Sequence, residues 1–583
     1  MDKHRIIIAA LTWFLIKDLW AQQPAFSSFS GKNPESSATA SAYDPAPIRR
    51  QIENERERKL QESTQGVNKN RFLEQFESER LSQNIDETRF GIRDWDIRGA
   101  KLVSMAQLES IVDPYRGLTI SLAELDRIAR RIEALYRDQS LLARVVIPAQ
   151  DVSAGTVRIE IVEARLGEVT VEGFDDGSLA KAIKNLIVSH HSLNEPLDLS
   201  RLERALSVVN ELPGVGVIAS LSPGLAHQET NLIVRNLASD PQRYDLELSI
   251  DNFGARSTGR ARKSLLWAWN RPFFWGDQLQ VQAMHSPGTE FVRMGYSVPV
   301  SRLGTKLTVF ASRLNYQVHQ TEFAALQPEG ESQSTGLELR QALWRLAHLR
   351  VDASASIEKK SFEQRAIGLD ANRRELMSRQ IGIEGRFTDD WVTQAIGASL
   401  RPSLSTFHIV WIQTALSQMI ASSETRLMRW SFARVQPLWA QSGFRPDTRF
   451  LIHYQGQQSP ERLDSAEAFY LGGASGVRAY PSSEGGGTNG RLINAEIRFQ
   501  WDPSVCLGLM RELGVVSETD SAAYRYQGYG VQMSWQCLPR TQARITLARR
   551  DKANPLANPL TGADRDGTRN ALQIWASINR AFQ

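Results

Sequence analysis

From about residue 240 to its end, the chain consists of segments in which apolar and polar side chains alternate, separated by turn-forming residues. Three segments carry apolar side chains at Tyr244, Leu246, Leu248 and Ile250, at Leu279, Val281 and Ala283, and at Ile493, Ala495, Ile497, Phe499 and Trp501. A period of two is typical of a β-strand with one apolar face. A soluble sandwich and a membrane barrel both fit, because the period does not say which face meets lipid.

Tryptophans and the last strand favour the barrel. Eleven of the 14 tryptophans follow residue 240, and several lie near the ends of expected strands, where an amphipathic ring suits the headgroup level of a membrane. They include Trp267, Trp269, Trp275, Trp501, Trp535 and Trp575. The chain also stops inside a strand in which Leu572, Ile574, Ala576 and Ile578 alternate with polar residues. Closure into a barrel would remove the exposed edge of such a strand.

The N-terminus indicates export. A positively charged start is followed by an apolar run from Ile6 to Ile16, and Ala21 offers a small residue for cleavage before Gln22. This run is too short for a membrane-spanning helix and has the organisation of a secretory signal peptide, residues 1–21. Residues 22–85 form a polar tail with a charged candidate helix at 46–61. That helix suits either a wet channel or solvent, where it would be a linker.

Two compact α+β units are expected between the tail and the barrel, at residues 86–164 and 165–237. Each reads as a strand, two helices and two strands. The helix start at Ser121 recurs at Asp198, and the closing strand with Val157, Ile159 and Ile161 recurs at Thr230 to Val234. The repeat indicates a duplicated small domain rather than a solenoid, because two copies are too few to stack.

Charge and motifs exclude several functions. The 583 residues carry 69 basic and 65 acidic side chains, a net charge of +4, which is not the basic footprint of a nucleic-acid-binding protein. Gly485 to Gly487 lack the lysine and helix of a phosphate loop, so a flexible loop tip is expected. His190 and His191 lack further ligands and are expected to be solvated. No nucleophile–base arrangement stands out. The sequence therefore predicts no cofactor, no metal and no enzymatic activity.

The order of these parts resembles the TpsB transporters of two-partner secretion, the FhaC- and ShlB-like family of the BamA superfamily. The segment Phe469-Tyr470-Leu471-Gly472-Gly473, followed by Val477-Arg478-Ala479-Tyr480, is similar to the VRGY/F motif of that superfamily's loop six. Asp251 to Gly254 and Trp275 to Leu279 resemble early strands of its barrel. The resemblance implies sixteen antiparallel strands over residues 238–583, two POTRA domains, and a loop six at about 471–490 that folds into the lumen.

Two positions depart from the family motif. Ala479 stands where the motif has glycine, and Glu512, followed by Gly514, stands where an aspartate is usual on the barrel wall. On the strand from Met510, residues 510, 512 and 514 share one face, and a carboxylate on that face belongs in the lumen. Arg478 is therefore expected to reach Glu512 through two parallel hydrogen bonds.

The two cysteines lie at neighbouring strand ends. Cys506 begins one expected strand and Cys537 ends the next, so both are expected at the periplasmic side. A disulfide and two free thiols both remain possible on these positions.

The resemblance implies a transporter in the bacterial outer membrane, in contact with its lipid. Periplasmic POTRA domains would capture an unfolded TpsA-like exoprotein by β-augmentation, and the client would thread through the polar lumen. That client would be an adhesin, a haemolysin or a contact-dependent toxin. The helix at 46–61 is expected to plug the resting lumen. The alternatives are a BamA-like assembly factor, which two POTRA domains rather than five disfavour, and a passive porin, which would lack them.

Overall fold

The computed structural model describes residues 44–64, 89–226, 228–237, 243–319, 327–346, 348–389, 402–418, 422–439, 447–519 and 521–582. The expected signal peptide and most of the polar tail lie outside these ranges. Within them, no helix is both long and apolar enough to cross a membrane.

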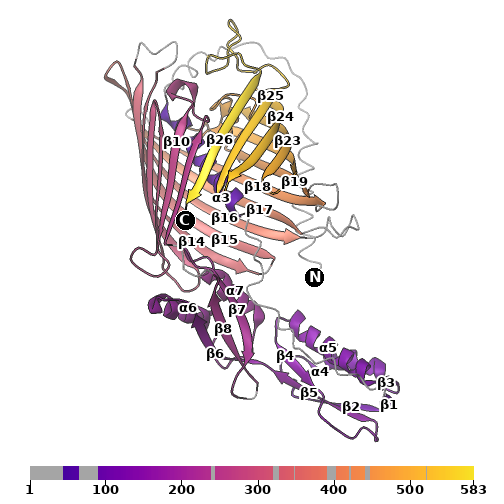
Figure 1. Ribbon diagram of the computed structural model, residues 1–583. Helices are drawn as coiled ribbons and strands as arrows, with labels where there is room; N and C mark the ends of the chain where they lie inside the picture. The colour runs from indigo at the N-terminus through magenta and orange to yellow at the C-terminus, as the bar shows by residue number, and fades with distance from the viewer. Residues whose placement is uncertain are drawn as a thin grey trace. The chain divides into compact units, whose positions relative to one another are not determined.

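Sixteen strands form one closed antiparallel barrel, which confirms the expected fold (Figure 1). They are β9 (Tyr244–Asp251), β10 (Arg262–Asn270), β11 (Gln278–Ser286), β12 (Thr289–Pro299), β13 (Thr305–Gln317), β14 (Glu329–Arg345), β15 (Leu349–Ala366), β16 (Leu369–Asp389), β17 (Ser403–Gln418), β18 (Ser422–Trp439), β19 (Asp447–Gln458), β22 (Asn489–Gln500), β23 (Val505–Ser517), β24 (Tyr524–Leu538), β25 (Thr541–Arg550) and β26 (Leu572–Phe582). The last strand closes the barrel on the first, with Ser577 opposite Asp251 and Phe582 opposite Leu246.

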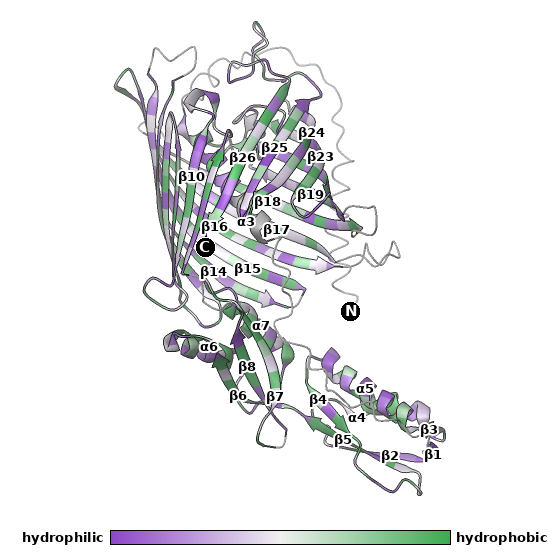
Figure 2. Ribbon diagram, in the orientation of Figure 1, coloured by the Kyte–Doolittle hydropathy of each residue, from purple (hydrophilic) through white to green (hydrophobic). Residues whose placement is uncertain are grey.

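The barrel buries its polar side chains and exposes its apolar ones. On β22, Asn494 and Glu496 are only 6% and 5% exposed, whereas on β26 the apolar Ile574 and Ile578 are both 53% exposed. Figure 2 shows the alternation as green and purple bands along the strands. In a soluble sandwich the apolar side chains are buried and the polar ones exposed. The barrel shows the reverse, because its outer face meets lipid and its inner face lines a polar lumen.

Aromatic rings gather where β9 to β12 end nearest the α+β domains. Tyr244, Trp267, Trp269, Phe273 and Tyr296 follow one another with ring centroids 6.0–6.3 Å apart. Such a belt marks a membrane–water interface.

Two of the tryptophans singled out in the sequence lie elsewhere. Trp575 is 6% exposed and points into the barrel, and Trp275 packs against the core of the second α+β domain.

The two α+β domains share one topology. The first comprises β2 (Asp94–Arg98), α4 (Met105–Val112), α5 (Leu122–Asp138), β4 (Ala143–Val146) and β5 (Thr156–Glu163), with sheet order β2-β5-β4. The second comprises β6 (Arg165–Glu172), α6 (Gly177–His190), α7 (Leu199–Val209), β7 (Val217–Pro223) and β8 (Glu229–Asn236), with order β6-β8-β7. In each sheet the first strand is parallel to the last, which lies in the middle. The first domain adds a ribbon of β1 (Arg89–Gly91) and β3 (Thr119–Ser121), and a single turn of 3-10 helix, Asp113–Tyr115.

Polar caps begin the domain helices. Ser121 and Glu124 form a capping box at α5, and Asp176 and Asp198 accept main-chain hydrogen bonds at the starts of α6 and α7.

His191 is fully buried rather than solvated, which corrects the expectation from sequence. Its Nε2 accepts a hydrogen bond from the Asp198 N–H at 3.0 Å, so the ring ties the end of α6 to the start of α7.

Candidate functional site in the barrel lumen

Residues 459–488 between β19 and β22 form loop six, which starts earlier than the sequence indicated and folds on itself. Its strands β20 (Phe469–Tyr470) and β21 (Gly486–Gly487) pair with each other. The Val477 N–H donates to the Leu471 carbonyl at 2.6 Å and the Tyr480 N–H to the Val477 carbonyl at 3.1 Å. The glycine run at Gly486 is therefore part of a packed ribbon, not a flexible tip.

Glu512 on β23 binds Arg478 at two points. Its Oε1 accepts from the Arg478 Nε at 2.6 Å, and its Oε2 accepts from the Arg478 main-chain N–H at 2.6 Å. The expected fork of two guanidinium N–H groups is thus replaced by one side-chain and one main-chain donor. Glu512 and Arg478 are 1% and 3% exposed, so the pair lies out of solvent. The arrangement fixes the turn of the loop as well as its charged end.

Further polar groups complete the environment of this pair. The Arg478 Nη1 donates to Gln532 at 3.1 Å, Asn494 donates to the Glu512 Oε1 at 2.9 Å, and the Trp575 indole donates to the Arg478 carbonyl at 2.7 Å. These groups come from β24, β22 and β26. Loop six is therefore anchored to four strands of one wall, including the last strand of the barrel.

Two wall glycines make room for loop six. A Cβ on Gly514 would lie 2.6 Å from Leu471 Cδ2, and a Cβ on Gly528 would lie 2.6 Å from the Ala479 Cβ. Both approaches are closer than carbon atoms tolerate. The methyl group of Ala479, the residue that departs from the family motif, is thus accommodated by the missing side chain of Gly528.

Tyr480 ends the motif in a closed pocket. Its ring meets Tyr526 edge-on at 4.8 Å between centroids, and its hydroxyl lies 3.3 Å from the Lys552 carbonyl. The side chain is fully buried. The four motif residues therefore all contribute to docking the loop on the wall.

A helix, α3 (Pro45–Thr64), lies inside the barrel and contacts β13, β14 and β15 (Figure 1). Its Arg49 donates to Ser332 and Ser312, each at 3.0 Å, and lies 3.5 Å from Glu358. Just before it, Asp44 binds Arg374 of β16 at 2.6 Å. Ile48 and Ile52 pack on Met284, Phe291 and Leu314. The helix therefore has one small apolar contact and many polar ones.

Lys360 on β15 links the helix to loop six. Its Nζ lies 3.2 Å from Glu467 of loop six, 3.9 Å from Glu53 of α3 and 3.6 Å from Glu358 of its own strand. Lys360 is 3% exposed. Sequence reasoning missed this residue, because the alternation places it on the polar face of β15 without indicating what enters the lumen.

The Phe253 carbonyl is a second link between helix and loop. It accepts from Gln51 of α3 at 2.8 Å and from Ser482 of loop six at 3.0 Å. Beside it, Arg262 joins Glu55 of the helix to Asp251 at the end of β9, with distances of 2.8 and 2.7 Å. The helix therefore also reaches the strand on which the barrel closes.

The candidate disulfide does not form in the structure, and both thiols are free. Cys506 lies opposite Ser534, and Cys537 follows three residues later, within the irregular stretch between Trp535 and Leu538 where β24 pairs with β25. Three residues of a strand span about 10 Å. A disulfide needs Cα atoms within about 7 Å.

Solved structures share this architecture. CdiB from Escherichia coli aligns with a TM-score of 0.66 at 17% identity, over 95% of this chain and 100% of that one. CdiB from Acinetobacter baumannii aligns with a TM-score of 0.65 at 16% identity, over 92% and 99%. At these identities the likeness establishes the fold.

Sequence comparisons identify the family. The heme/hemopexin transporter protein HuxB of Haemophilus influenzae is 24% identical over 88% of this chain and 90% of its own length. The outer membrane transporter CdiB of Dickeya dadantii is 20% identical over 70% and 72%. A model of the ShlB-type POTRA domain matches residues 90–164, and a model of the haemolysin secretion/activation protein ShlB/FhaC/HecB matches residues 228–533, more than half of the chain. The chain belongs to this ShlB/FhaC/HecB family, the TpsB transporters of the bacterial outer membrane, whose POTRA domains lie in the periplasm.

Proposed function

We propose that the chain binds an unfolded exoprotein in the periplasm through its POTRA domains and passes it through the barrel to the cell surface. The proposal rests on the polar contacts by which the helix α3 is held in the lumen. The helix α3 is held by side chains such as Arg49 and Glu55, through hydrogen bonds and ion pairs to a polar wall. Such contacts exchange for water at modest net cost, so the helix can leave without unfolding the barrel.

The edge strand β7 of the second POTRA domain is the proposed binding surface. No strand pairs with its outer edge among the residues that the structure describes. The Val217 N–H points away from β8 and donates to Asn210 at 2.8 Å. Because donors alternate along an antiparallel strand, the N–H groups of Ala219 and Leu221 point the same way. An extended client segment would add to this edge by β-augmentation.

A proline at position 219 tests the edge. Ala219→Pro removes one outward donor, whereas Ala219→Gly keeps it and serves as the matched control. We expect the proline variant to release much less client into the medium, in cells that co-express a candidate TpsA-like exoprotein. Equal release by the two variants, with equal barrel levels in the outer membrane, would show that the client does not use β7.

The driving force in this proposal is client folding outside the cell, as the family resemblance implies. The sequence has no nucleotide-binding motif. The BamA-like alternative makes a different prediction. An assembly factor would change the levels of other barrel proteins when its gene is deleted, whereas a dedicated transporter would change only the release of its client.

A further inference from the structure

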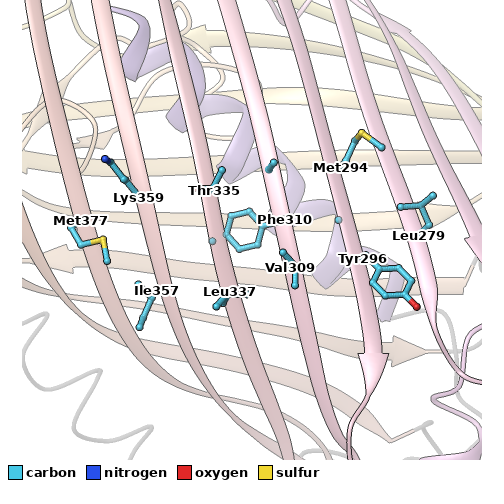
Figure 3. Close-up of a pocket in the computed structure, with 13 residues that line it drawn as sticks. Leu279, Met294, Tyr296, Val309, Phe310, Thr335, Leu337, Ile357, Lys359 and Met377 are labelled. Carbon is cyan, nitrogen blue, oxygen red and sulfur yellow. The ribbon is translucent and has the colours of Figure 1, made fainter.

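The outer face of β11 to β19 carries two adjacent apolar grooves. One, of about 600 Å³, is lined by outward residues that include Met294, Val309, Leu337 and Ile357 (Figure 3). The second, of about 1010 Å³, shares Leu337 and Ile357 with the first and continues to Trp411. In Figure 3 the helix α3 lies behind the strands, so the labelled side chains are seen from outside the barrel.

Small side chains between large ones create these grooves. Ala355 lies between Leu339 and Ile381 in the register of β14, β15 and β16. Ala311 likewise lies between Met294 and Thr335. Ile381 is 66% exposed, so the walls of the groove project outward while the alanines form its floor. Grooves of this kind fit separate acyl chains better than a flat wall does.

Three cations lie along the edge of the grooves that is farther from the POTRA domains. They are Lys359, Arg379 and Arg426. Arg379 pairs in register with Ile357 on one side and with Gln413 on the other, and Gln413 pairs with Arg426. Lys359 lies two residues after Ile357 on β15, farther from the POTRA domains, and pairs in register with Met377. Neighbouring strands are about 4.8 Å apart, which places the backbones at Arg379 and Arg426 about 10 Å apart.

Carboxylates accompany two of these cations but not the central one. Lys359 lies 2.9 Å from Glu375, and Arg426 lies 3.4 Å from Glu461. Glu424 accepts a hydrogen bond from Gln413. Across the described ranges, no acidic side chain pairs with Arg379, which is exposed directly above the apolar Ile381. A guanidinium that faces lipid and has no carboxylate partner in the protein is expected to bind an anionic group of the membrane.

The length of β16 places this edge of the grooves at the headgroup level of the outer leaflet. From Arg379, the outward residues are Ile381, Ile383, Gly385 and Phe387, and polar groups return at Asp389, which binds Arg434 at 2.8 Å. Ten residues of a strand tilted by roughly 40° rise about 25 Å, the height of the apolar band of an outer-membrane barrel. Since β16 runs toward the POTRA end of the barrel, Arg379 lies at the cell-surface end of this band.

We propose that this face binds one lipid A molecule, the phosphorylated, multiply acylated disaccharide of the outer leaflet. Arg379 and Arg426 bind its phosphates, and the two grooves hold its acyl chains. A disaccharide separates its two phosphates on the scale of these two arginines, whereas a glycerophospholipid brings a single phosphate and two chains. Arginine suits this contact because its planar fork binds phosphate through two hydrogen bonds.

Binding of bis-phosphoryl lipid A to the full-length protein in detergent tests the proposal, with native mass spectrometry as the readout. Arg379→Gln and Arg426→Gln are each expected to weaken binding about tenfold, the effect of losing one charge-assisted hydrogen bond. Arg373→Gln is the matched control. Arg373 lies on the outward face of the same strand, higher up, and pairs with Glu363 at 3.4 Å.

The lipid comparison decides the class of ligand. Phosphatidylglycerol should bind at least about tenfold more weakly than bis-phosphoryl lipid A, because it brings one phosphate instead of two. Heat-modifiable migration of each variant in gels reports whether its barrel is folded. Wild-type affinity in both folded arginine variants, or equal affinity for the two lipids, would overturn the proposal.

Discussion

Glu512 holds Arg478 from two sides, with one carboxylate oxygen on the guanidinium and the other on the main-chain N–H of the same residue. Loop six is thereby fixed in both position and orientation on the lumen wall. A buried pair of this kind adds little net stability compared with apolar packing, but the loss of one partner leaves an uncompensated charge. The main role of the pair is therefore to favour one conformation of loop six.

Removal of either partner is expected to impair secretion. Arg478→Ala leaves the buried Glu512 carboxylate without its cation, which costs about 3–5 kcal/mol and releases loop six. Glu512→Ala leaves Arg478 with only the longer contact to Glu496, at 3.8 Å, and is expected to act in the same direction. The outer-membrane level of the barrel should stay nearly unchanged, and Arg478→Lys should restore secretion only in part. Client release and barrel level are measured together. Arg511→Ala is the control, since Arg511 is adjacent to Glu512 but faces outward and pairs with Asp551. Wild-type secretion by Arg478→Ala would refute the role of the pair.

The fit of Ala479 against Gly528 predicts a rescue. Gly528→Ala would bring two Cβ atoms within 2.6 Å and should displace loop six. Ala479→Gly removes the opposing methyl, after which the nearest remaining contact of the new Cβ is the Arg549 carbonyl at 3.3 Å. The double variant should therefore secrete better than Gly528→Ala alone. Additive loss in the double variant would show that the two residues do not touch in the working protein.

Much of this fold could be predicted from sequence, because it depends on periodicity. The alternation at Ile493 to Trp501 defines a strand with two unlike faces, and the recurrence of the helix start at Asp198 defines the repeated domain. The approach of Arg478 to Glu512 followed from the motif and from the side-chain parity of β23. The geometry of this contact could not be predicted, because the alternation of side chains places a residue on one face of a strand but does not specify which donor it meets.

The failures of sequence reasoning concern long-range contacts. Lys360 is one polar residue among many on β15, and only the folded helix and loop six show that it faces Glu53 and Glu467. The positions of the cysteines at adjoining strand ends left a disulfide and two free thiols both possible, because the register offset of three residues between them could not be predicted from sequence. His191 follows a helix in sequence, and its burial depends on the start of the next helix at Asp198.

Lys360 is expected to hold the helix in the closed lumen. Lys360→Gln removes the cation shared by Glu53, Glu467 and Glu358, so both α3 and loop six lose an anchor. Planar-bilayer recordings should show more frequent large openings. The control is Lys359→Gln, one residue earlier and facing outward at 56% side-chain exposure. Identical opening frequencies in the two variants would remove Lys360 from the mechanism.

The second POTRA domain is expected to weaken in acid. Burial lowers the pKa of His190 below its ordinary value of 6.5, and Arg204 lowers it further, so folding favours the neutral ring. The unfolded state then binds more protons, and the stability that His190 contributes above the unfolded pKa is lost as pH falls below it. The protection factors of the α6 amides, which compare each exchange rate with the intrinsic rate at the same pH, should therefore fall from about pH 7.5 to about pH 5.5. His190→Gln should show a smaller pH dependence, and an equal one would assign the effect to other groups.

The helix α3 is expected to close the path through the lumen, and single-channel conductance in planar bilayers measures whether it does. A chain without residues 45–64 should conduct through a wide, persistently open pore, because Arg49, Glu53 and Glu55 no longer bridge the lumen wall. A chain without residues 66–85, a deletion of the same length in the polar tail, should conduct like the full chain. If the conductance of the 45–64 deletion equals that of the full chain, α3 does not plug the lumen in the closed state.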